Sequence, residues 1–322
     1  MDKAGNFYGV TADGGDLACF GGSGCGTVFE LGADGDETTL FTFTGAGDGA
    51  YPFYGLVRDE EGNLFGITTE GGDLSCPFAS NGCGVVFEIS SAGVFTVLHA
   101  FAGGADGSDP GSELLLDSAG NLYGTTYYGG GATGCGQMVG CGTVFKIDNM
   151  GNETVLYRFL GGRDGANPSW NLALDTAGNL YGITGSGGDL HCKETRGNGC
   201  GAVFKLDPNG ILTVLHTFTG GADGASPSGL VRDSAGNLYG TTLGGGGQYC
   251  KYRRSTCGTV FKIDVSGNET ILHAFAGGAD GTTPTWLTLD QVGNLYGTTV
   301  EGGAGKYCSN FGCGTIYRIA LH

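Results

Sequence analysis

The stretch Gly-Asn-Leu-Tyr-Gly-Thr-Thr at residues 236–242 belongs to a motif, Gly-Asn-[Phe/Leu]-[Tyr/Phe]-Gly, that recurs along the whole chain. Successive copies are 57 or 58 residues apart. A fixed period of this length is typical of propellers and solenoids. The asparagines that mark the copies are Asn6, Asn63, Asn121, Asn179, Asn237 and Asn294.

One repeat, read from Pro227 onward, contains four short segments rich in β-branched and aromatic residues, at 229–233, 237–242, 258–264 and 269–275. Turn residues bound each segment, each is too short for a helix, and no apolar spacing of 3.6 is present. Four strands in a repeat of this length predict a propeller blade. We therefore expect an all-β fold: a six-bladed β-propeller of 57–58-residue four-stranded repeats, with one disulfide per blade, forming a single domain over residues 1–322.

Composition supports a folded chain and excludes some partners. Glycine supplies 69 residues, which favours a fold full of tight turns, and the 14 Tyr and 18 Phe are enough to build a core. The formal net charge of −17 disfavours nucleic acid and anionic lipid as partners. No apolar run approaches the roughly 18 residues that a membrane-spanning helix needs.

The twelve cysteines fall into six local pairs, one per repeat, which predicts disulfides formed in an oxidising compartment. A metal site would need closer spacing or nearby histidines, and only His191 lies in such a loop. We expect each disulfide to contribute about 2 kcal/mol at most, pinning its own loop without joining blades. The pairs are Cys19/Cys25, Cys76/Cys83, Cys135/Cys141, Cys192/Cys200, Cys250/Cys257 and Cys308/Cys313.

The chain ends carry a separate expectation. Residues 1–10, MDKAGNFYGV, do not form a signal peptide, which conflicts with the cysteine pattern and favours a trimmed or truncated chain. The second and third strands occur six times and the first and fourth five times, so the first and last blades are incomplete. We expect the natural protein either to begin upstream of Met1, or to complete a blade with a strand from another copy of itself through its open blade edges.

The motifs GNLYGTT (236–242), GCGTVFKID (140–148), GNETILHAF (267–275) and GGADGTTP (277–284) together resemble the GloVer tandem repeat. The resemblance covers essentially the whole chain. It implies a bacterial secreted or cell-surface protein, often with a variable C-terminal anchor, which is not present before His322. It implies no particular reaction. The stretch 229–240 is also similar to NHL-type and gluconolactonase-like propellers, as a fold-level analogy only.

Positions that are equal in every repeat are predicted to pack between blades. They are the leucine of the first strand, the aromatic residue of the third strand and the last phenylalanine of the fourth strand. These residues are Leu56, Leu114, Leu172, Leu230 and Leu287; Phe29, Phe87, Phe145, Phe204, Phe261 and Tyr317; and Phe43, Phe101, Phe159, Phe218 and Phe275.

Variable positions point to function. Tight turns join the first strand to the second and the third strand to the fourth, and these turns share one face. The two long loops share the other face, where we place any functional surface. The start of the first strand varies most, and it should line the central channel at that face. We expect a sugar-stacking or ring-binding mouth there, although bulky residues could simply plug the channel. The candidates are Tyr54, Glu113, Trp170, Asn171 and Trp286.

Two further recurring residue types have competing explanations. Loop aspartates recur in five repeats and could form a Ca²⁺-binding ring, but identical placement favours Asp-Gly turns whose side chains cap their own backbone. Histidines near the end of the fourth strand should lie on separate outer rims, where they cannot converge on one substrate, so we interpret them as packing residues. The two sets are Asp48, Asp106, Asp164, Asp223 and Asp280, and His99, His216 and His273.

The sequence contains no G-x-S-x-G, H-E-x-x-H, P-loop or EF-hand motif. It therefore favours a secreted or cell-surface, non-enzymatic propeller that acts as a binding or structural module, with extracellular polysaccharide as a possible ligand and no cofactor beyond Ca²⁺. One alternative is an extracellular polysaccharide hydrolase or lyase. Another is a subunit that assembles with itself into a filament.

Overall fold

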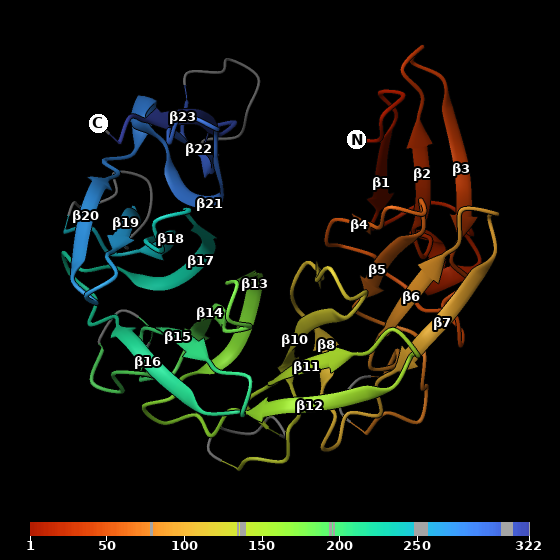
Figure 1. The fold of residues 1–322 in the computed structure, drawn as a ribbon, viewed down its shortest axis with the longest axis horizontal. Coiled ribbons are helices and arrows are strands. Elements are labelled where there is room, and N and C mark those ends of the chain that lie inside the picture. Colours follow the sequence, from red (N-terminus) through yellow and green to blue (C-terminus); the bar gives the residue numbers. More distant parts are fainter. Residues whose placement is uncertain are drawn as a thin grey trace. The chain divides into compact units, whose positions relative to one another are not determined.

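A computed structural model describes residues 1–77, 80–133, 135, 140–192, 195, 197–247, 257–303 and 312–321. Two compact units make up the chain, Met1–Phe159 and Leu160–His322. Among the described residues the strands form six antiparallel sheets, three in each unit (Figure 1). The fold is a six-bladed β-propeller; the expectation that it forms a single domain stays a prediction.

The repeat quoted above folds as predicted. Its four strands are β17 (Ala225–Arg232), β18 (Leu238–Gly244), β19 (Thr259–Ile263) and β20 (Glu269–Ala274), and they pair in that order. The first strand begins four residues earlier than predicted. Ala225 pairs with Gly244 and Pro227 pairs with Thr242, and the register shifts between Pro227 and Gly229. These two additional pairs extend the strand towards its N-terminal end.

The other blades follow the same order. In the first unit they are β1 (Phe7–Thr11), β2 (Thr27–Leu31) and β3 (Glu37–Thr42); β4 (Val57–Arg58), β5 (Leu64–Thr68), β6 (Val85–Ile89) and β7 (Phe95–Ala100); and β8 (Ser108–Pro110), β9 (Leu115–Leu116), β10 (Leu122–Tyr128), β11 (Thr143–Ile147) and β12 (Glu153–Arg158). In the second unit they are β13 (Ala166–Leu174), β14 (Leu180–Ser186), β15 (Ala202–Leu206) and β16 (Leu212–Thr217); β17 to β20; and β21 (Thr282–Leu289), β22 (Leu295–Glu301) and β23 (Thr315–Ile319). Two short 3₁₀ turns, η1 (Cys19–Gly22) and η2 (Gly278–Asp280), lie in long loops.

The Asn and Tyr of the recurring motif both bind the aspartate that opens the preceding tight turn. In the third blade Asp117 accepts hydrogen bonds from the backbone and side-chain nitrogens of Asn121, at 2.9 and 2.8 Å, and from the Tyr123 hydroxyl at 3.1 Å. The same three partners recur at Asp175, Asn179 and Tyr181. The motif therefore encodes the turn between the first two strands.

The motif's second glycine lies under the aromatic ring of the third strand. Gly124 pairs with Phe145, and a Cβ atom on Gly124 would lie 2.5 Å from Phe145 Cζ and 3.2 Å from Leu114 Cδ2. The equivalent distance from Gly182 to Phe204 Cζ is also 2.5 Å. Only glycine leaves room for the ring.

That ring also joins one blade to the next. Phe145 packs edge-on against Phe101, which directly follows the preceding blade's fourth strand, β7, with ring centroids 5.2 Å apart. Both phenylalanines are fully buried. The predicted inter-blade role of these aromatic positions is confirmed in four blade pairs. The other three contacts are Phe43–Phe87, Phe218–Phe261 and Phe275–Tyr317.

The cysteine loops contact the following blade, which the sequence analysis did not expect. The carbonyl of Cys83 accepts a hydrogen bond from the backbone N–H of Asp109 at 3.0 Å, and Gly84 lies against the ring of Pro110. Cys200 and Ser226 repeat the bond in the second unit at 2.9 Å. The four disulfides found lie within their own loops, whereas the backbone carbonyl of the second cysteine anchors the next repeat.

Four predicted disulfides are present: Cys19–Cys25, Cys76–Cys83, Cys135–Cys141 and Cys192–Cys200. Cys257 and Cys313 are also disulfide-bonded. Their predicted partners, Cys250 and Cys308, lie outside the described residues.

We predict that all six disulfides link cysteines of the same repeat. Peptide mapping by mass spectrometry after alkylation without reductant should find six local links and no labelled thiol. Replacing Cys76 and Cys83 together by Ser should lower the free energy of unfolding by about 2 kcal/mol, because the loop loses its constraint in the unfolded state. A link between two repeats would contradict the assignment.

A second prediction concerns the glycine under the ring. Gly124→Ala should lower the free energy of unfolding, measured by urea denaturation, by about 2–3 kcal/mol, because the new methyl overlaps Phe145. Gly104→Ala is the matched control, since a Cβ atom there meets nothing within 4 Å. Equal unfolding midpoints for the two variants would show that the ring does not depend on the glycine.

Candidate functional site

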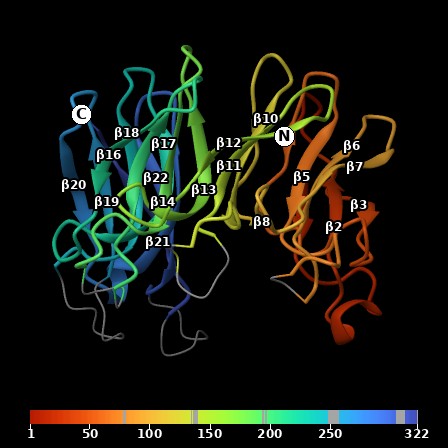
Figure 2. The same cartoon turned by 90° about the horizontal axis from the view of Figure 1, so that it is seen from below.

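The first strands of neighbouring blades in the second unit lie side by side, as β13, β17 and β21 (Figures 1 and 2). Two predicted site residues occupy the outer two of these strands. Trp170 lies in β13 and Trp286 in β21, and their rings meet edge to face with centroids 5.9 Å apart. The structure therefore brings together the only two tryptophans of the sequence.

Small residues on the intervening strand allow the two rings to meet. Strand β17 carries Ser228 and Gly229 at this level, and a Cβ atom on Gly229 would lie 2.6 Å from the carbonyl oxygen of Thr285. The Ser228 hydroxyl donates to the carbonyl of Pro284 at 2.8 Å. Strand β17 is thus tied to the backbone of β21 beside Trp286.

The two indoles differ in environment. Trp286 is 41% exposed, which is high for a tryptophan, whereas Trp170 is half-buried against the core of its unit. Trp170 also has a φ of +67°, a left-handed conformation that is costly for a bulky residue. Asn171 follows it in β13 and is half-buried. The pair therefore presents one accessible indole, that of Trp286, which packs against the half-buried and strained Trp170.

The other two predicted residues lie in the first unit. Tyr54 precedes β4, and Glu113 lies between β8 and β9. A Cβ atom on Gly55, the residue after Tyr54, would lie 2.8 Å from Glu113 Oε1, so these neighbours come together between two blades. Whether they share one site with the tryptophans stays a prediction.

A residue that the sequence analysis missed, Asp109, lies at the centre of a cluster in the first unit. It precedes Pro110 and has a φ of +54°. Ser108 pairs with Tyr128 and Pro110 with Thr126, so Asp109 lies opposite Tyr127. The Tyr127 and Tyr128 rings meet edge to face at 4.7 Å. Electrostatic interactions link Asp109 to Tyr54, Glu70, Tyr127 and Tyr128, and we call these five residues the acid–tyrosine cluster.

Burial and mutual charge perturb this cluster. Burial, reinforced by the charge of Glu70, raises the pKa of Asp109 to about 6. Burial also raises the pKa of Glu113 and, together with the charge of Asp109, the pKa values of Tyr54 and Tyr127. Perturbed groups of this kind concentrate at functional sites. The cluster is therefore a second candidate site.

A comparison of the repeats could have found it. Two positions vary between repeats: the residue before the proline, and the second residue after the threonine that ends the motif in the second strand. In the first unit all of them are acidic or tyrosine; in the second only Glu301 is. In chain order they are Tyr51, Asp109, Asn167, Ser226 and Thr283, and Asp13, Glu70, Tyr128, Ser186, Gly244 and Glu301.

The five loop aspartates cap their own turns. Each carboxylate accepts a hydrogen bond from the backbone N–H four residues earlier, at 2.6–2.9 Å. Burial alone would raise the pKa of Asp223, but hydrogen bonds from His216 and from the N–H and hydroxyl of Thr219 outweigh it and hold that pKa low. Identical turns in five repeats account for these residues, and Ca²⁺ binding by them stays a prediction.

The strand histidines contact these same aspartates. His216 Nε2 lies 2.9 Å from Asp223 Oδ1, and His273 Nε2 lies 3.1 Å from Asp280 Oδ1. Each of these histidines also packs edge-on against the phenylalanine two residues later. Because the fourth strand is the last of each sheet, the three histidines lie on separate blade edges, as predicted.

At three of these rim positions the side chain contacts the start of the next blade's fourth strand. His99 interacts with Glu153, and His216 with Glu269, whose pKa values are raised by burial. Where phenylalanine replaces the histidine, phenylalanine also replaces the glutamate: Phe41 stacks on Phe95 at 3.8 Å. This matching marks the histidines as blade-packing residues.

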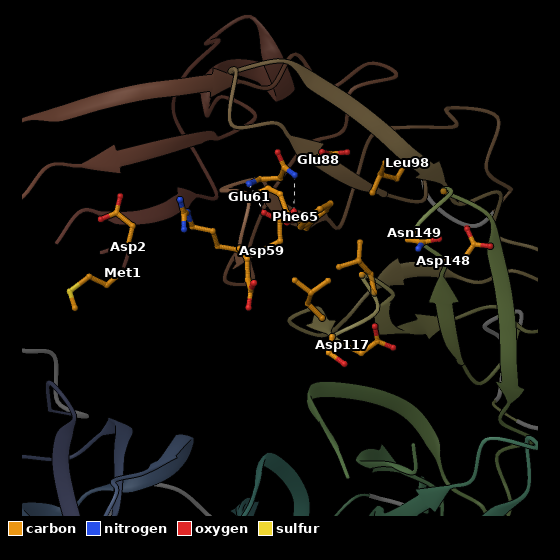
Figure 3. A pocket seen from close by; sticks show the side chains of 18 of the residues that line it. Met1, Asp2, Asp59, Glu61, Phe65, Glu88, Leu98, Asp117, Asp148 and Asn149 are labelled. Carbon is orange, nitrogen blue, oxygen red and sulfur yellow. Dashed lines mark hydrogen bonds between the residues drawn. The ribbon is translucent and has the colours of Figure 1, made fainter. Parts of the chain in front are cut away.

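A cavity of about 1010 Å³ opens on the tight-turn face of the first unit, opposite to the face predicted to bind (Figure 3). Phe65, Leu98 and several leucines line it beside the turn residues. Figure 3 shows the carboxylates of Asp59, Asp117 and Asp148 spread along it. Asp117 and Asp148 already accept the hydrogen bonds of their own turns, so this polar lining has a structural explanation.

The described part of the chain lacks two features. No helix there is long and apolar enough to cross a membrane. No group of three or more His, Cys, Asp or Glu residues within the described ranges is placed to hold a metal ion.

Comparisons with known proteins agree with the fold. A family model described as Gloeobacter/Verrucomicrobia repeat matches residues 1–139 and 131–317. A solved structure of a catalytically inactive virginiamycin B lyase from Staphylococcus aureus with quinupristin is similar at 14% identity, covering 84% of this chain and 70% of that one, with a TM-score of 0.54. A streptogramin B lyase structure is similar at 12% identity, covering 100% and 85%, with a TM-score of 0.54. At such identities the likeness shows the fold alone. No curated protein matches the sequence.

The pKa of Asp109 yields a prediction. Its folded value of about 6 lies above the ordinary 3.8, so folding favours the protonated form, and ionisation destabilises the protein as pH rises through 6. Asp109→Asn should therefore raise the free energy of unfolding at pH 7 by about 2 kcal/mol, and the gain should vanish below about pH 4. Urea denaturation at both pH values measures it; a variant less stable than wild type at pH 7 would contradict the assignment.

Proposed function

The chain belongs to the Gloeobacter/Verrucomicrobia repeat family, and we propose that it is an extracellular, non-enzymatic binding module for polysaccharide. The repeat supplies a rigid framework of blades, and the variable residues on the long-loop face supply the binding groups. Function placed on loops and strand ends of a rigid scaffold is common in proteins.

The tryptophan pair carries this proposal. Sugar rings have apolar faces that pack on indole rings, and an aromatic side chain with one face accessible offers the required surface. Trp286 is 41% exposed, and Trp170 and β21 hold it in place. A residue that only filled the interior would be buried instead.

The disulfides support an extracytoplasmic location. Four links are present among the described residues, and such bonds persist in oxidising compartments. The net charge of −17 also limits the polysaccharides that we expect to bind, because an acidic surface repels anionic polymers and leaves neutral or cationic ones as ligands.

A second candidate function is cleavage of polysaccharide by a hydrolase or lyase reaction. Asp109 favours it, because a carboxyl group with a pKa of about 6 can act as a general acid near neutral pH. The lyases of similar fold do not strengthen it, given their low identity. Release of shortened oligosaccharides, followed by mass spectrometry, distinguishes the two functions, and we expect none.

Binding to a panel of cellulose, chitin, chitosan, xylan and pectin, measured by affinity electrophoresis and then calorimetry, tests the proposal. Trp286→Ala should weaken binding to any polysaccharide found by about 30-fold, as expected for the loss of an interfacial tryptophan. The thermal midpoint should fall only slightly, because Trp286 is 41% exposed and its ring lies outside the buried core.

Phe7→Ala is the matched control, since Phe7 is a 54% exposed aromatic residue on β1 of the first unit. It should bind like wild type. Failure to bind any member of the panel, or equal affinities for wild type and Trp286→Ala, would show that the tryptophan pair is not a polysaccharide site.

A further inference from the structure

The aromatic ring of the recurring motif carries a cation of the protein itself in five of the six blades. In three blades the cation comes from the residue opposite on the third strand, and in two it comes from the residue before the turn aspartate of the next blade. Each cation lies 5.5–5.9 Å from the ring centroid, where the ring quadrupole attracts it. The pairs are Tyr8–Arg58, Tyr123–Lys146, Tyr181–Arg232, Tyr239–Lys262 and Tyr296–Arg318.

The second blade is the exception, because its motif ring, Phe65, has no such cation among the described residues. The residue opposite Phe65 on the third strand is Glu88, and the residue before the next turn aspartate is Leu116. The Glu88 carboxylate makes no hydrogen bond or ion pair within the part of the chain that the structure describes. Both places that supply a cation elsewhere therefore hold an anion or an apolar side chain.

Phe65 lines the cavity on the tight-turn face, and every residue that lines this cavity belongs to the first unit (Figure 3). Seven of the lining residues are Asp or Glu, against two cations, Lys3 and Arg58, and Arg58 already covers another ring. Phe65, Leu98 and Leu116 are partly buried and pack against the core below. The cavity thus combines an acidic rim with an apolar floor around a ring that lacks its cation.

The turn aspartate of this blade also has one donor fewer than in the other blades. In the third blade the Tyr123 hydroxyl donates to Asp117 at 3.1 Å, whereas Phe65 has no hydroxyl to offer Asp59. Among the described residues, the Asp59 carboxylate accepts side-chain and backbone hydrogen bonds from Asn63 alone, both at 2.7 Å. Asp59 can therefore accept a further hydrogen bond from a ligand in the cavity.

We propose that this cavity docks a basic segment of a partner protein, whose lysine or arginine side chain lies on Phe65 with its charge paired to Glu88 and Asp59. The ligand's cation then takes the place that a cation of the chain itself takes on the other five rings. The aliphatic part of the side chain packs on Leu98 and Leu116, as long basic side chains do on apolar surfaces.

The size of the cavity favours a peptide segment over a small free amine. Its volume of about 1010 Å³ lies at the upper end of the roughly 300–1,000 Å³ typical of ligand pockets, so residues beside the basic one can enter as well. The excess of carboxylates favours a basic partner, since opposite charges across an interface set which partner is chosen. This surface lies in the first unit and is separate from the tryptophan pair of the proposed function.

Fluorescence anisotropy with the intact protein and dye-labelled, end-blocked peptides at pH 7 tests this inference. The probes are Ser-Leu-Lys-Leu-Ser, its arginine counterpart, and a counterpart with norleucine, which keeps the aliphatic chain and lacks the charge. The lysine and arginine peptides should bind at least about 10-fold more tightly than the norleucine peptide, the value of one good charge contact. The preference should shrink between 0.05 and 0.5 M NaCl, because salt screens the ion pairs.

Glu88→Lys is the decisive variant, because it supplies the lysine that Lys146 provides in the third blade. The new side chain should cover Phe65 and weaken binding of the lysine peptide at least about 10-fold. Glu30→Lys is the matched control: Glu30 holds the same position in the first blade, opposite Tyr8, and does not line the cavity. It changes the net charge equally and should bind like wild type.

A poorly folded Glu88→Lys, judged by its thermal midpoint, is replaced by Glu88→Gln, which should weaken binding by about 3-fold. Equal affinities for the lysine and norleucine peptides, or equal losses in Glu88→Lys and Glu30→Lys, would overturn the inference. Spermidine binding as tight as that of the lysine peptide would show a site for free amines and would contradict peptide docking. Trp286→Ala should leave peptide binding unchanged, so failure here and failure of the polysaccharide proposal are distinguishable.

Discussion

Every blade depends on one contact, the aromatic ring of the third strand lying on the glycine of the second. Phe145 on Gly124 and Phe204 on Gly182 show the same close approach, which a methyl group would block. The ring then reaches the last phenylalanine of the preceding blade, so one side chain serves both the packing within a blade and the packing between blades. The hydrophobic and dispersion terms of these buried rings are the main favourable contribution to the structure.

This contact confines variation to the strand ends. Residues near the ring cannot change without a cavity or an overlap, whereas the start of the first strand and the end of the second lie outside the stack. Trp170 and Asp109 are found there, and both have left-handed backbone conformations. The conformation at Asp109 recurs before the proline of four other repeats, so it belongs to the framework, and the Cys83 carbonyl and Pro110 hold it in place.

The sequence predicts much of this arrangement because the repeat is a set of local signals. The Asp-x-x-Gly-Asn turn and the loop aspartate caps rest on neighbours a few residues away, and both are found. The phenylalanines contact distant residues, but their recurrence at one place in every repeat made them predictable. The early start of β17 could not be predicted, since it depends on pairing with Gly244 beyond an irregularity in register. The bond from Asp109 to the Cys83 carbonyl also escaped prediction, because it joins two blades. For the same reason Asp109 was missed: its raised pKa comes from burial and from Glu70, 39 positions away in the sequence.

The tryptophan pair supplies the apolar surface of the proposed binding module. Both tryptophans of the chain belong to the pair, so intrinsic tryptophan emission reports on that surface alone. Titration with a soluble oligosaccharide that binds is therefore the most direct measurement. The account predicts a saturable change in tryptophan emission whose midpoint equals the calorimetric dissociation constant. Binding that saturates with no change in emission would place the ligand elsewhere and contradict the central claim.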